Sequence, residues 1–292
     1  KNTLLLSGTG NSRPTGCMCA WVSSSLKTST MLKSLFITFM IAVVMIACKD
    51  KDDQPPGPTD KEGFIEVTGG RVWYKISGAG KTGIPLLVLH GGPGVPHDYL
   101  LSLEALTNER PVIFYDQLGC GNSDQPNDTT LWTVDRFVDE LVAVRNELNI
   151  PQMHLLGQSW GTMLALEYLH GELPDGIVSL TLAAPYLNTQ KWVADQQSLV
   201  LQLPQSVQDT IAKYEALGEY TADGYQEAMM IFYSKHVCRL DPWPEDLLTA
   251  MEKIGYGVYG YMWGPSEFTM TGTLKNADVT EYLTDLDMPV LY

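Results

Sequence analysis

The 292-residue sequence has few charged side chains, few basic residues and no long hydrophobic run. Charged residues make up 18% of the chain, and 34 acidic against 19 basic residues give a net charge of −15. This acidic excess disfavours nucleic acid as a partner, because the phosphate backbone would repel it. It suits a substrate with a cationic group, although solubility alone also accounts for it. With 45% hydrophobic residues, the chain is long enough for one large domain, or for a core with an insertion.

The cysteines match no disulfide framework and no zinc-binding spacing. They are Cys17, Cys19, Cys48, Cys120 and Cys238. The sequence also has no Gly-x-Gly-x-x-Gly after a predicted strand and no Walker loop, so nothing in it indicates a nucleotide. We therefore expect neither a metal site nor a nucleotide site.

The beginning of the chain is typical of a targeting segment. Residues 1–30 are rich in serine and threonine, show no periodicity and do not start with methionine. Met31 and Lys33 then precede a mostly apolar stretch at 35–47. This stretch is shorter than the roughly 20 residues that span a bilayer, and it has the form of a secretory signal. We interpret Met31 as the true start and residues 1–30 as upstream sequence.

The apolar stretch ends in Met45-Ile46-Ala47-Cys48, which resembles a bacterial lipobox and predicts lipidation of Cys48. Residues 31–48 are then a lipoprotein signal, and the polar, proline-rich residues 49–62 are a tether that does not fold. We expect the protein to be held at the bacterial cell envelope by this lipid anchor, with its body in water. The alternative is an ordinary cleaved signal in which Cys48 is incidental.

Buried strands alternate with amphipathic helices over residues 63–185. Strands are predicted at 64–67, 72–76, 85–90, 112–115, 153–156 and 177–183, and helices at 134–148 and 160–170. Gly69-Gly70 joins the first two strands in a hairpin, and Thr133 can cap the first helix. This order predicts an α/β fold with a mostly parallel sheet that is covered on both faces.

Residues 186–270 have a different pattern, with no buried strand. They carry aromatic and large aliphatic side chains on helix-like stretches, and we interpret them as a helical cap inserted over the sheet. Residues 271–292 return to the core, and another buried strand begins at Met288.

A Gly-x-Ser-x-Gly pentapeptide, residues 157–161, lies between a predicted strand and a predicted helix. In that context the glycines allow a tight turn, known as the nucleophile elbow, which lifts the Ser159 hydroxyl above the sheet. The helix N-terminus beneath it favours developing negative charge. We therefore predict that Ser159 is the nucleophile of a serine hydrolase. A simple glycine turn is the alternative.

A glycine-rich loop, His90-Gly91-Gly92-Pro93-Gly94, follows an earlier predicted strand. In a fold with a nucleophile elbow this loop supplies one backbone N–H to the oxyanion, and the residue after the nucleophile supplies the other. We therefore expect Gly92 and Trp160 to form the oxyanion hole. His90 is expected to shape the loop through hydrogen bonds, and a role as the catalytic base is the alternative.

Together these motifs resemble the proline iminopeptidase, or prolyl aminopeptidase, family. The matching segments, in order, are HGGPGVPHDYL (90–100), FYDQLGCGNSDQP (114–126), LLGQSWGTMLALEY (155–168) and MWGPSEFTMTGTLKNAD (262–278). The resemblance implies an α/β-hydrolase fold with a helical cap. It also implies release of N-terminal proline from peptides through an acyl-enzyme on Ser159, without a cofactor.

The resemblance further implies that Glu267 binds the free amino group of the substrate. A buried carboxylate paired with a protonated nitrogen would restrict cleavage to the chain's N-terminus. Asp116 and Gln117 are expected to fix their loop, and Cys120 to be a buried thiol. Thr162 departs from the family pattern, because many relatives have a glycine there, and we expect the change to be tolerated.

A serine nucleophile needs a base and an acid that orients the base, and in this fold the chain order is Ser, Asp, His. No histidine follows His236, and none of the five histidines is at the expected position. We expect the catalytic Asp and His to lie beyond residue 292, with the last strands and helices missing. These residues alone should then be inactive and aggregation-prone. The alternatives are a non-catalytic, membrane-tethered binding protein, or another esterase or amidase of the same fold.

Overall fold

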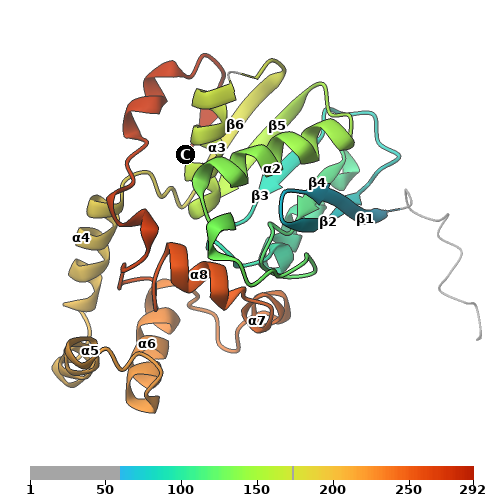
Figure 1. Ribbon diagram of the computed structural model, residues 1–292. Coiled ribbons are helices and arrows are strands. Elements are labelled where there is room, and N and C mark those ends of the chain that lie inside the picture. The colour runs from blue at the N-terminus through green and yellow to red at the C-terminus, as the bar shows by residue number, and fades with distance from the viewer. Residues whose placement is uncertain (1–59, 173) are drawn as a thin grey trace, which may run out of the picture. The chain divides into compact units, whose positions relative to one another are not determined.

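The computed structural model describes residues 60–172 and 174–292 (Figure 1). The predicted signal, the lipidation site Cys48 and nearly all of the tether lie outside the described residues, so they stay predictions. Within the described ranges, no helix has the length and apolar character needed to cross a membrane.

Seven strands of the described chain form one sheet, in the order β1-β2-β4-β3-β5-β6-β7. Their bounds are β1 Lys61–Val67, β2 Gly70–Ser77, β3 Leu86–Leu89, β4 Val112–Tyr115, β5 Met153–Gln158, β6 Ile177–Ala183 and β7 Val290–Leu291. The hairpin β1–β2 and the pair β2–β4 are antiparallel, and every other pair is parallel. The predicted mostly parallel sheet is confirmed. β1 begins two residues before the predicted core boundary at Gly63.

The central strands are buried on both faces, which explains why they read as unbroken apolar runs. Every residue of β3 and β4 is buried. Leu87 and Leu89 pack with helices α2 (Val134–Glu147) and α3 (Trp160–Glu172) on one face. Leu86 and Val88 pack on the other face, against the 3₁₀ helix η1 (His97–Asn108). The Thr133 hydroxyl caps α2 as predicted, by accepting a hydrogen bond from the Arg136 N–H.

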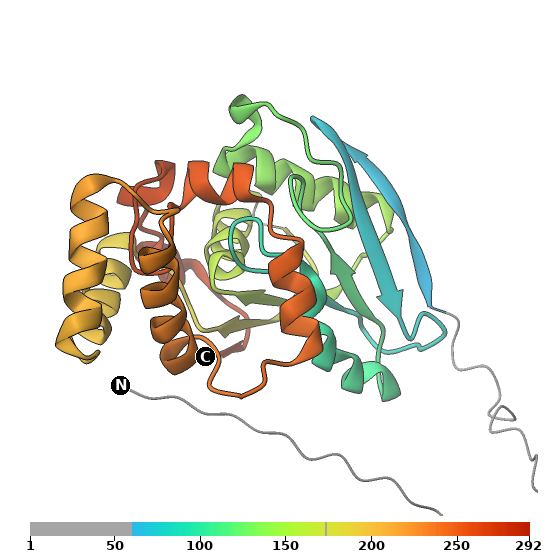
Figure 2. The same cartoon turned by 90° about the horizontal axis from the view of Figure 1, so that it is seen from below.

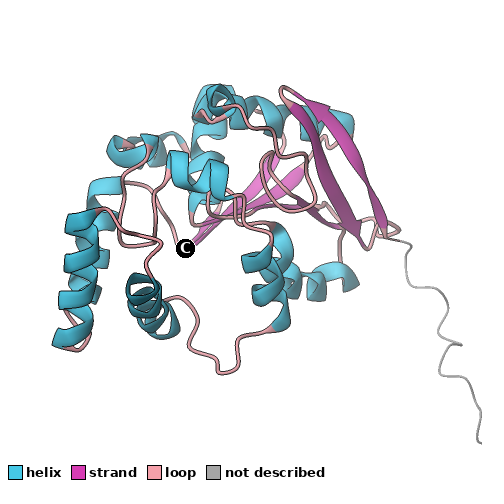
Figure 3. Cartoon of the chain, turned by 60° about the horizontal axis from the view of Figure 1, so that its bottom comes forward, coloured by secondary structure: helices cyan, strands magenta, loops and turns pink. Residues whose placement is uncertain are grey.

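The segment 186–270 contains helices and no strand of the sheet. The helices are α4 Thr189–Val200, α5 Gln205–Leu217, α6 Asp223–His236, α7 Glu245–Glu252 and α8 Tyr256–Met262. They lie together on one side of the sheet, apart from α2 and α3 (Figures 1 and 3), and Figure 2 shows them from below. Phe232, Tyr225 and Phe268 form the centre of a second hydrophobic cluster within this group. Short helices η3 (Thr273–Asn276) and η4 (Thr280–Asp285) then lead to β7.

The junction between α7 and α8 is attached to the core beside η1. Lys253 Nζ forms an ion pair with Asp98 Oδ1 at 2.8 Å, and the Gly255 N–H donates to the Gly94 carbonyl at 2.9 Å. The Asp98 side chain is only 8% exposed, and its Oδ2 has no hydrogen-bond partner among the described residues. Lys253 therefore compensates a buried carboxylate and ties the helical segment to the loop after β3.

Replacing this lysine, in Lys253→Met, should lower the free energy of unfolding by about 2 kcal/mol. Removing one partner of a buried pair costs about 3–5 kcal/mol, and we reduce this because Lys253 itself is 35% exposed. Chemical denaturation measures the effect. Lys191→Met is the matched control, because its ion pair with Asp195 is exposed and should contribute almost nothing. If Asp98→Asn does not recover stability in the Lys253→Met background, the uncompensated charge is not the cause.

Candidate active site

Ser159 is the single residue between the end of β5 and the start of α3. Its φ of +51° is in the left-handed region, where a residue with a side chain is strained. Two contacts fix this turn: the Ser159 N–H donates to the Ala183 carbonyl at 3.0 Å, and the Ser159 carbonyl accepts from the Thr162 N–H at 2.8 Å. Ser159 is partly exposed, although the residue that follows it, Trp160, is completely buried.

The turn has no room for larger neighbours. A β-carbon on Gly157 would lie 2.3 Å from the Gly161 carbonyl oxygen, well inside contact distance. Thr162, which departs from the family pattern, stabilises the turn: its hydroxyl donates to the Ser159 carbonyl at 2.6 Å and accepts from the Tyr186 N–H at 2.9 Å. The elbow predicted from the pentapeptide therefore has the backbone geometry that its chemistry requires.

The loop after β3 lies against the elbow. A β-carbon on Gly91 would be 3.2 Å from Ser159 Cβ. Gly92 has a φ of +114°, and a β-carbon there would meet the Gly94 nitrogen at 2.3 Å, so only glycine fits. The His90 ring lies 2.9 Å from the Gly91 carbonyl through Nδ1. In a trans peptide the next N–H points the opposite way, so the Gly92 N–H is turned away from His90.

Two backbone N–H groups beside Ser159 are free to bind an oxyanion. The Gly92 N–H has no acceptor among the described hydrogen bonds. Trp160 is the first residue of α3, and the first N–H groups of a helix have no partner within it. Trp160 directly follows the nucleophile and Gly92 follows the glycine that lies against it, and the function of both as oxyanion donors stays a prediction.

His90 is fully engaged in shaping this loop. Its Nε2 accepts from the Gln117 N–H at 2.9 Å, so Nδ1 carries the proton and donates to the Gly91 carbonyl. Burial lowers the pKa of His90 to about 4, so the ring is neutral at pH 7. The Gln117 side chain also bonds the His90 carbonyl and the Trp160 indole. These contacts favour the structural role and leave neither ring nitrogen available to act as a base.

The remaining histidines also have partners away from the nucleophile. His97 contacts Asp116 at 2.7 Å, His154 contacts Ser179 at 2.7 Å, His170 contacts Asp285 at 2.8 Å, and His236 packs on the Phe232 ring. Among the described residues, no hydrogen bond joins a histidine to Ser159. The nucleophile therefore has no histidine base within these residues.

Tyr99, on η1, is a site residue that was not predicted from the sequence. Its hydroxyl accepts from the Gly91 N–H at 2.8 Å and donates to Gln158 Oε1 at 2.5 Å. Burial raises the pKa of Tyr99, and the charge of Glu267 raises it further, so the phenol stays protonated. No pattern in the sequence indicates these contacts, because the partners are 8 and 59 residues away along the chain.

Glu267 lies in a loop that aromatic side chains hold in place. Its Oε1 accepts from the Tyr259 hydroxyl at 2.7 Å, and its backbone bonds the Tyr233 hydroxyl and the Trp192 indole. Burial raises the pKa of Glu267, and the bond from Tyr259 opposes this shift. Within the described chain no hydrogen bond reaches Oε2, which leaves this oxygen able to accept from a ligand.

The Glu267 carboxylate lies within electrostatic range of Tyr99, whose pKa it raises. Tyr99 contacts both Gln158, the residue before the nucleophile, and Gly91. Next to Glu267, the rings of Tyr186, Trp192 and Trp263 pack edge to face, with centroids 4.9–5.9 Å apart. The site therefore combines a serine, free N–H donors, an acidic side chain and an aromatic wall.

Comparison with known proteins identifies the family. A family model described as alpha/beta hydrolase fold matches residues 84–224. The proline iminopeptidase of Heyndrickxia coagulans is 46% identical over 234 residues, which cover 79% of this chain and 80% of the relative. The chain belongs to the proline iminopeptidase family. The proline iminopeptidase of Clostridium botulinum is 38% identical with the same coverage.

Solved structures agree with this family membership. The structure of the proline iminopeptidase of Mycobacterium smegmatis has a TM-score of 0.70 and 36% identity, and that of a protein designated VinJ has 0.75 and 38%. Each comparison covers 79% of this chain and 80% of the other. The predicted α/β-hydrolase fold and the assignment to the prolyl aminopeptidase class are both confirmed by these relatives.

In this iminopeptidase scaffold, side chains of the loop after β4 are buried and form hydrogen bonds with neighbouring backbone groups. Asp116 accepts from the His97 N–H and the Asn122 N–H, each at 2.9 Å. Cys120 is completely buried, its Sγ lies 3.3 Å from the Gln117 carbonyl, and burial raises the pKa of its thiol. Cys120 is therefore an inert, protonated thiol and not a second nucleophile.

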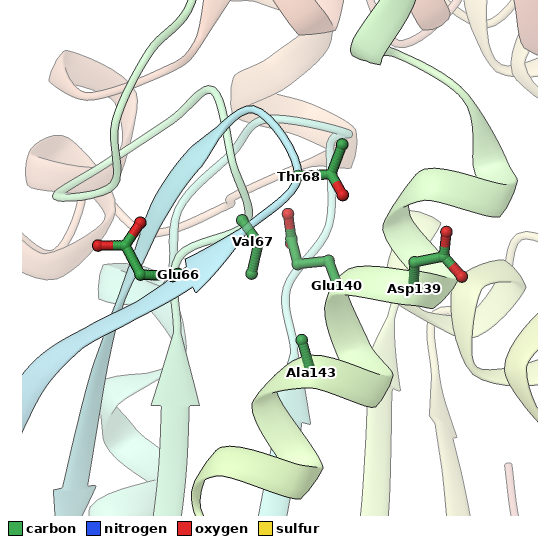
Figure 4. Close-up of a pocket in the computed structure, with 6 residues that line it drawn as sticks. All are labelled: Glu66, Val67, Thr68, Asp139, Glu140 and Ala143. Carbon is green, nitrogen blue, oxygen red and sulfur yellow. The ribbon is translucent and has the colours of Figure 1, made fainter.

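A hollow of about 390 Å³ lies between the β1–β2 hairpin and α2, away from the nucleophile (Figure 4). Its lining residues are Glu66, Val67, Thr68, Asp139, Glu140 and Ala143. The Glu140 carboxylate is already paired with Arg136 and accepts from the Leu118 N–H. The hollow contains no nucleophile, and within the described residues no cluster of histidine, cysteine and acidic side chains could hold a metal ion.

Proposed function

We propose that the chain carries the nucleophile, oxyanion donors and amine-binding carboxylate of an enzyme that releases proline from the N-terminus of peptides. The observation that carries this proposal is the half-buried Glu267, whose Oε1 alone has a hydrogen-bond donor among the described residues and whose charge acts on Tyr99 beside the elbow. A carboxylate in such a setting selects a cationic partner. The names of the relatives point to proline as the residue that bears this charge.

In the proposed reaction, Ser159 Oγ attacks the carbonyl carbon of the N-terminal proline. The tetrahedral oxyanion accepts hydrogen bonds from the Gly92 and Trp160 N–H groups, and each such donor is typically worth about 10²–10³ in rate. The C–N bond then breaks, the peptide amine leaves with a proton, and proline remains esterified to Ser159. Water hydrolyses this acyl-enzyme and regenerates the hydroxyl.

Proton transfer needs a base that takes the Ser159 proton and returns it to the leaving amine. Four of the five histidines form hydrogen bonds away from Ser159, and His236 packs on the Phe232 ring in α6, so we propose that the described residues bind the substrate without turning it over by themselves. Glu267 is not a candidate for this base, because its proposed task requires it to stay ionised against the substrate ammonium.

The amine requirement tests the proposed substrate class. The native chain should bind L-prolinamide about 10²-fold more tightly than N-acetyl-L-prolinamide, because acetylation removes the positive charge that Glu267 recognises. Isothermal titration calorimetry with both ligands at neutral pH measures the ratio. Equal affinities would contradict the aminopeptidase proposal and favour an esterase or amidase of the same fold.

A further inference from the structure

We propose that Tyr99 is a positioning residue that holds the Gly91 N–H and, together with the bond from His90 to the Gly91 carbonyl, keeps the Gly92 N–H turned toward the oxyanion. The inference rests on the proposed function of Gly92. It concerns a side chain that touches neither the scissile bond nor the attacking oxygen.

The first support is that the backbone N–H and carbonyl of Gly91 each form a hydrogen bond, with two different side chains. The Gly91 N–H donates to the Tyr99 hydroxyl at 2.8 Å, and the Gly91 carbonyl accepts from His90 Nδ1 at 2.9 Å. Two successive glycines have the greatest backbone freedom of any dipeptide. The Tyr99 bond fixes the peptide before Gly91 and the His90 bond fixes the peptide that carries the Gly92 N–H, so neither plane can rotate about Gly91 without losing a hydrogen bond.

The second support is the contact on the elbow side. The Tyr99 hydroxyl donates to Gln158 Oε1 at 2.5 Å, and a β-carbon on Gly91 would lie 2.5 Å from the same oxygen. The Gln158 side chain therefore fills the space into which Gly91 would swing. Tyr99 holds the oxyanion loop and the residue before Ser159 with one oxygen atom, which sets the spacing between the two halves of the oxyanion hole.

The third support is the rigidity of Tyr99 itself. Its neighbour Asp98 is tied to Lys253 at 2.8 Å, and His97 donates its backbone N–H to Asp116 at 2.9 Å. The start of η1 is thus anchored to two other segments. The phenol also stays protonated beside Glu267, so it donates to Gln158 and accepts from Gly91 throughout the neutral range.

If the Gly92 N–H is held less firmly in place, the affinity for a tetrahedral adduct should fall more than the affinity for a planar ligand. The reason is that the oxyanion forms only in the tetrahedral state. Pyrrolidine-2-boronic acid probes that state, since its boron replaces the proline carbonyl carbon and can bond Ser159 Oγ. L-Prolinamide probes the planar state with the same ring and the same ammonium. The ratio of the two affinities therefore reports on the tetrahedral state, with binding of the ring and the ammonium cancelled.

The test compares the native chain with Tyr99→Phe, which keeps the ring and removes the hydroxyl. We expect the affinity for the boronic acid to fall about 10–10²-fold, while the affinity for L-prolinamide stays the same. Tyr256→Phe is the matched control, because Tyr256 is 70% exposed and should change neither affinity. An equal fall for both ligands would overturn the proposal, since it would indicate general damage to the site.

Amide hydrogen exchange supplies a second readout that needs no ligand. In Tyr99→Phe the Gly91 N–H loses its acceptor and should exchange about 10-fold faster, whereas the amides of β3 and β5 keep their native rates. Unchanged exchange at Gly91, or faster exchange throughout the sheet, would overturn the proposal. If the native chain shows neither amine selectivity nor a boronate adduct, the proposed function fails, while exchange at Gly91 still decides whether Tyr99 holds the loop.

Discussion

The native chain is expected to capture pyrrolidine-2-boronic acid as a covalent adduct on Ser159, and Ser159→Ala is expected to lose this adduct completely. Ser159 Oγ forms a bond to boron, the boron becomes tetrahedral and anionic, and the hydroxyl proton passes to the buffer. One boronate oxygen can then accept from the Gly92 and Trp160 N–H groups, as the oxyanion would. Boron-11 NMR distinguishes the tetrahedral adduct from the free trigonal acid.

Misfolding of the Ser159→Ala variant should not be the cause of the lost adduct. Alanine at 159 keeps the left-handed φ of +51° at a cost similar to that of serine, and the Ser159 contacts that fix the turn come from its backbone. Ser159→Ala should therefore unfold at nearly the native temperature and bind L-prolinamide as before. A native chain that binds prolinamide but forms no adduct would favour the non-catalytic binding protein.

The same native chain is expected to show no measurable hydrolysis of a prolyl-arylamide, although it forms the adduct. Boronate capture needs only the nucleophile and the oxyanion donors, while turnover also needs a base that moves a proton twice. The histidines are held by Gly91 and Gln117, Asp116, Ser179, Asp285 and the Phe232 ring. Turnover that disappears in Ser159→Ala would show that a group among these residues does serve as the base.

The parts of the fold that could be predicted are those whose signal is local. Strands β3 and β4 lie inside the sheet, so burial on both faces leaves an unbroken apolar run in the sequence. The nucleophile elbow is equally local, because the tight turn demands small residues within five positions. By contrast, η1 has no strong helical periodicity, since its leucines at 100, 101 and 103 face the sheet from a 3₁₀ helix.

The parts of the site that escaped prediction depend on contacts between distant segments. Tyr99 acquires its function from Gly91 and Gln158, and nothing near Tyr99 in the sequence specifies either partner. The ion pair of Asp98 with Lys253 joins residues 155 positions apart. Glu267 was predicted only through the family resemblance, because an isolated glutamate in a loop is usually solvated. What makes it unusual is the surrounding aromatic side chains from α4, α6 and α8.

Glu267→Gln should lower the affinity for L-prolinamide by roughly 10²-fold, which corresponds to about 2–3 kcal/mol. Glutamine keeps the size of the side chain and can still accept from the Tyr259 hydroxyl, so the loop should stay in place. It loses the negative charge that the unpaired Oε2 offers to an ammonium. Affinity for N-acetyl-L-prolinamide, which has no charge, should hardly change. Glu219→Gln, at an exposed position, is the control for general effects of charge.

The direction of the Glu267 pKa shift makes it possible to tell loss of the charge from misfolding as the cause of weaker prolinamide binding. Burial raises the pKa of the carboxyl in the folded state, so its ionisation costs folding free energy as the pH rises above the ordinary value for glutamate. Glu267→Gln avoids that cost and should be at least as stable as the native chain at neutral pH. Prolinamide binding to the native chain should weaken as the pH falls through the raised pKa, and the variant should lack this dependence. A variant that keeps the native pH profile would exclude Glu267 as the group that binds the amine, and a less stable variant would attribute its loss of affinity to misfolding.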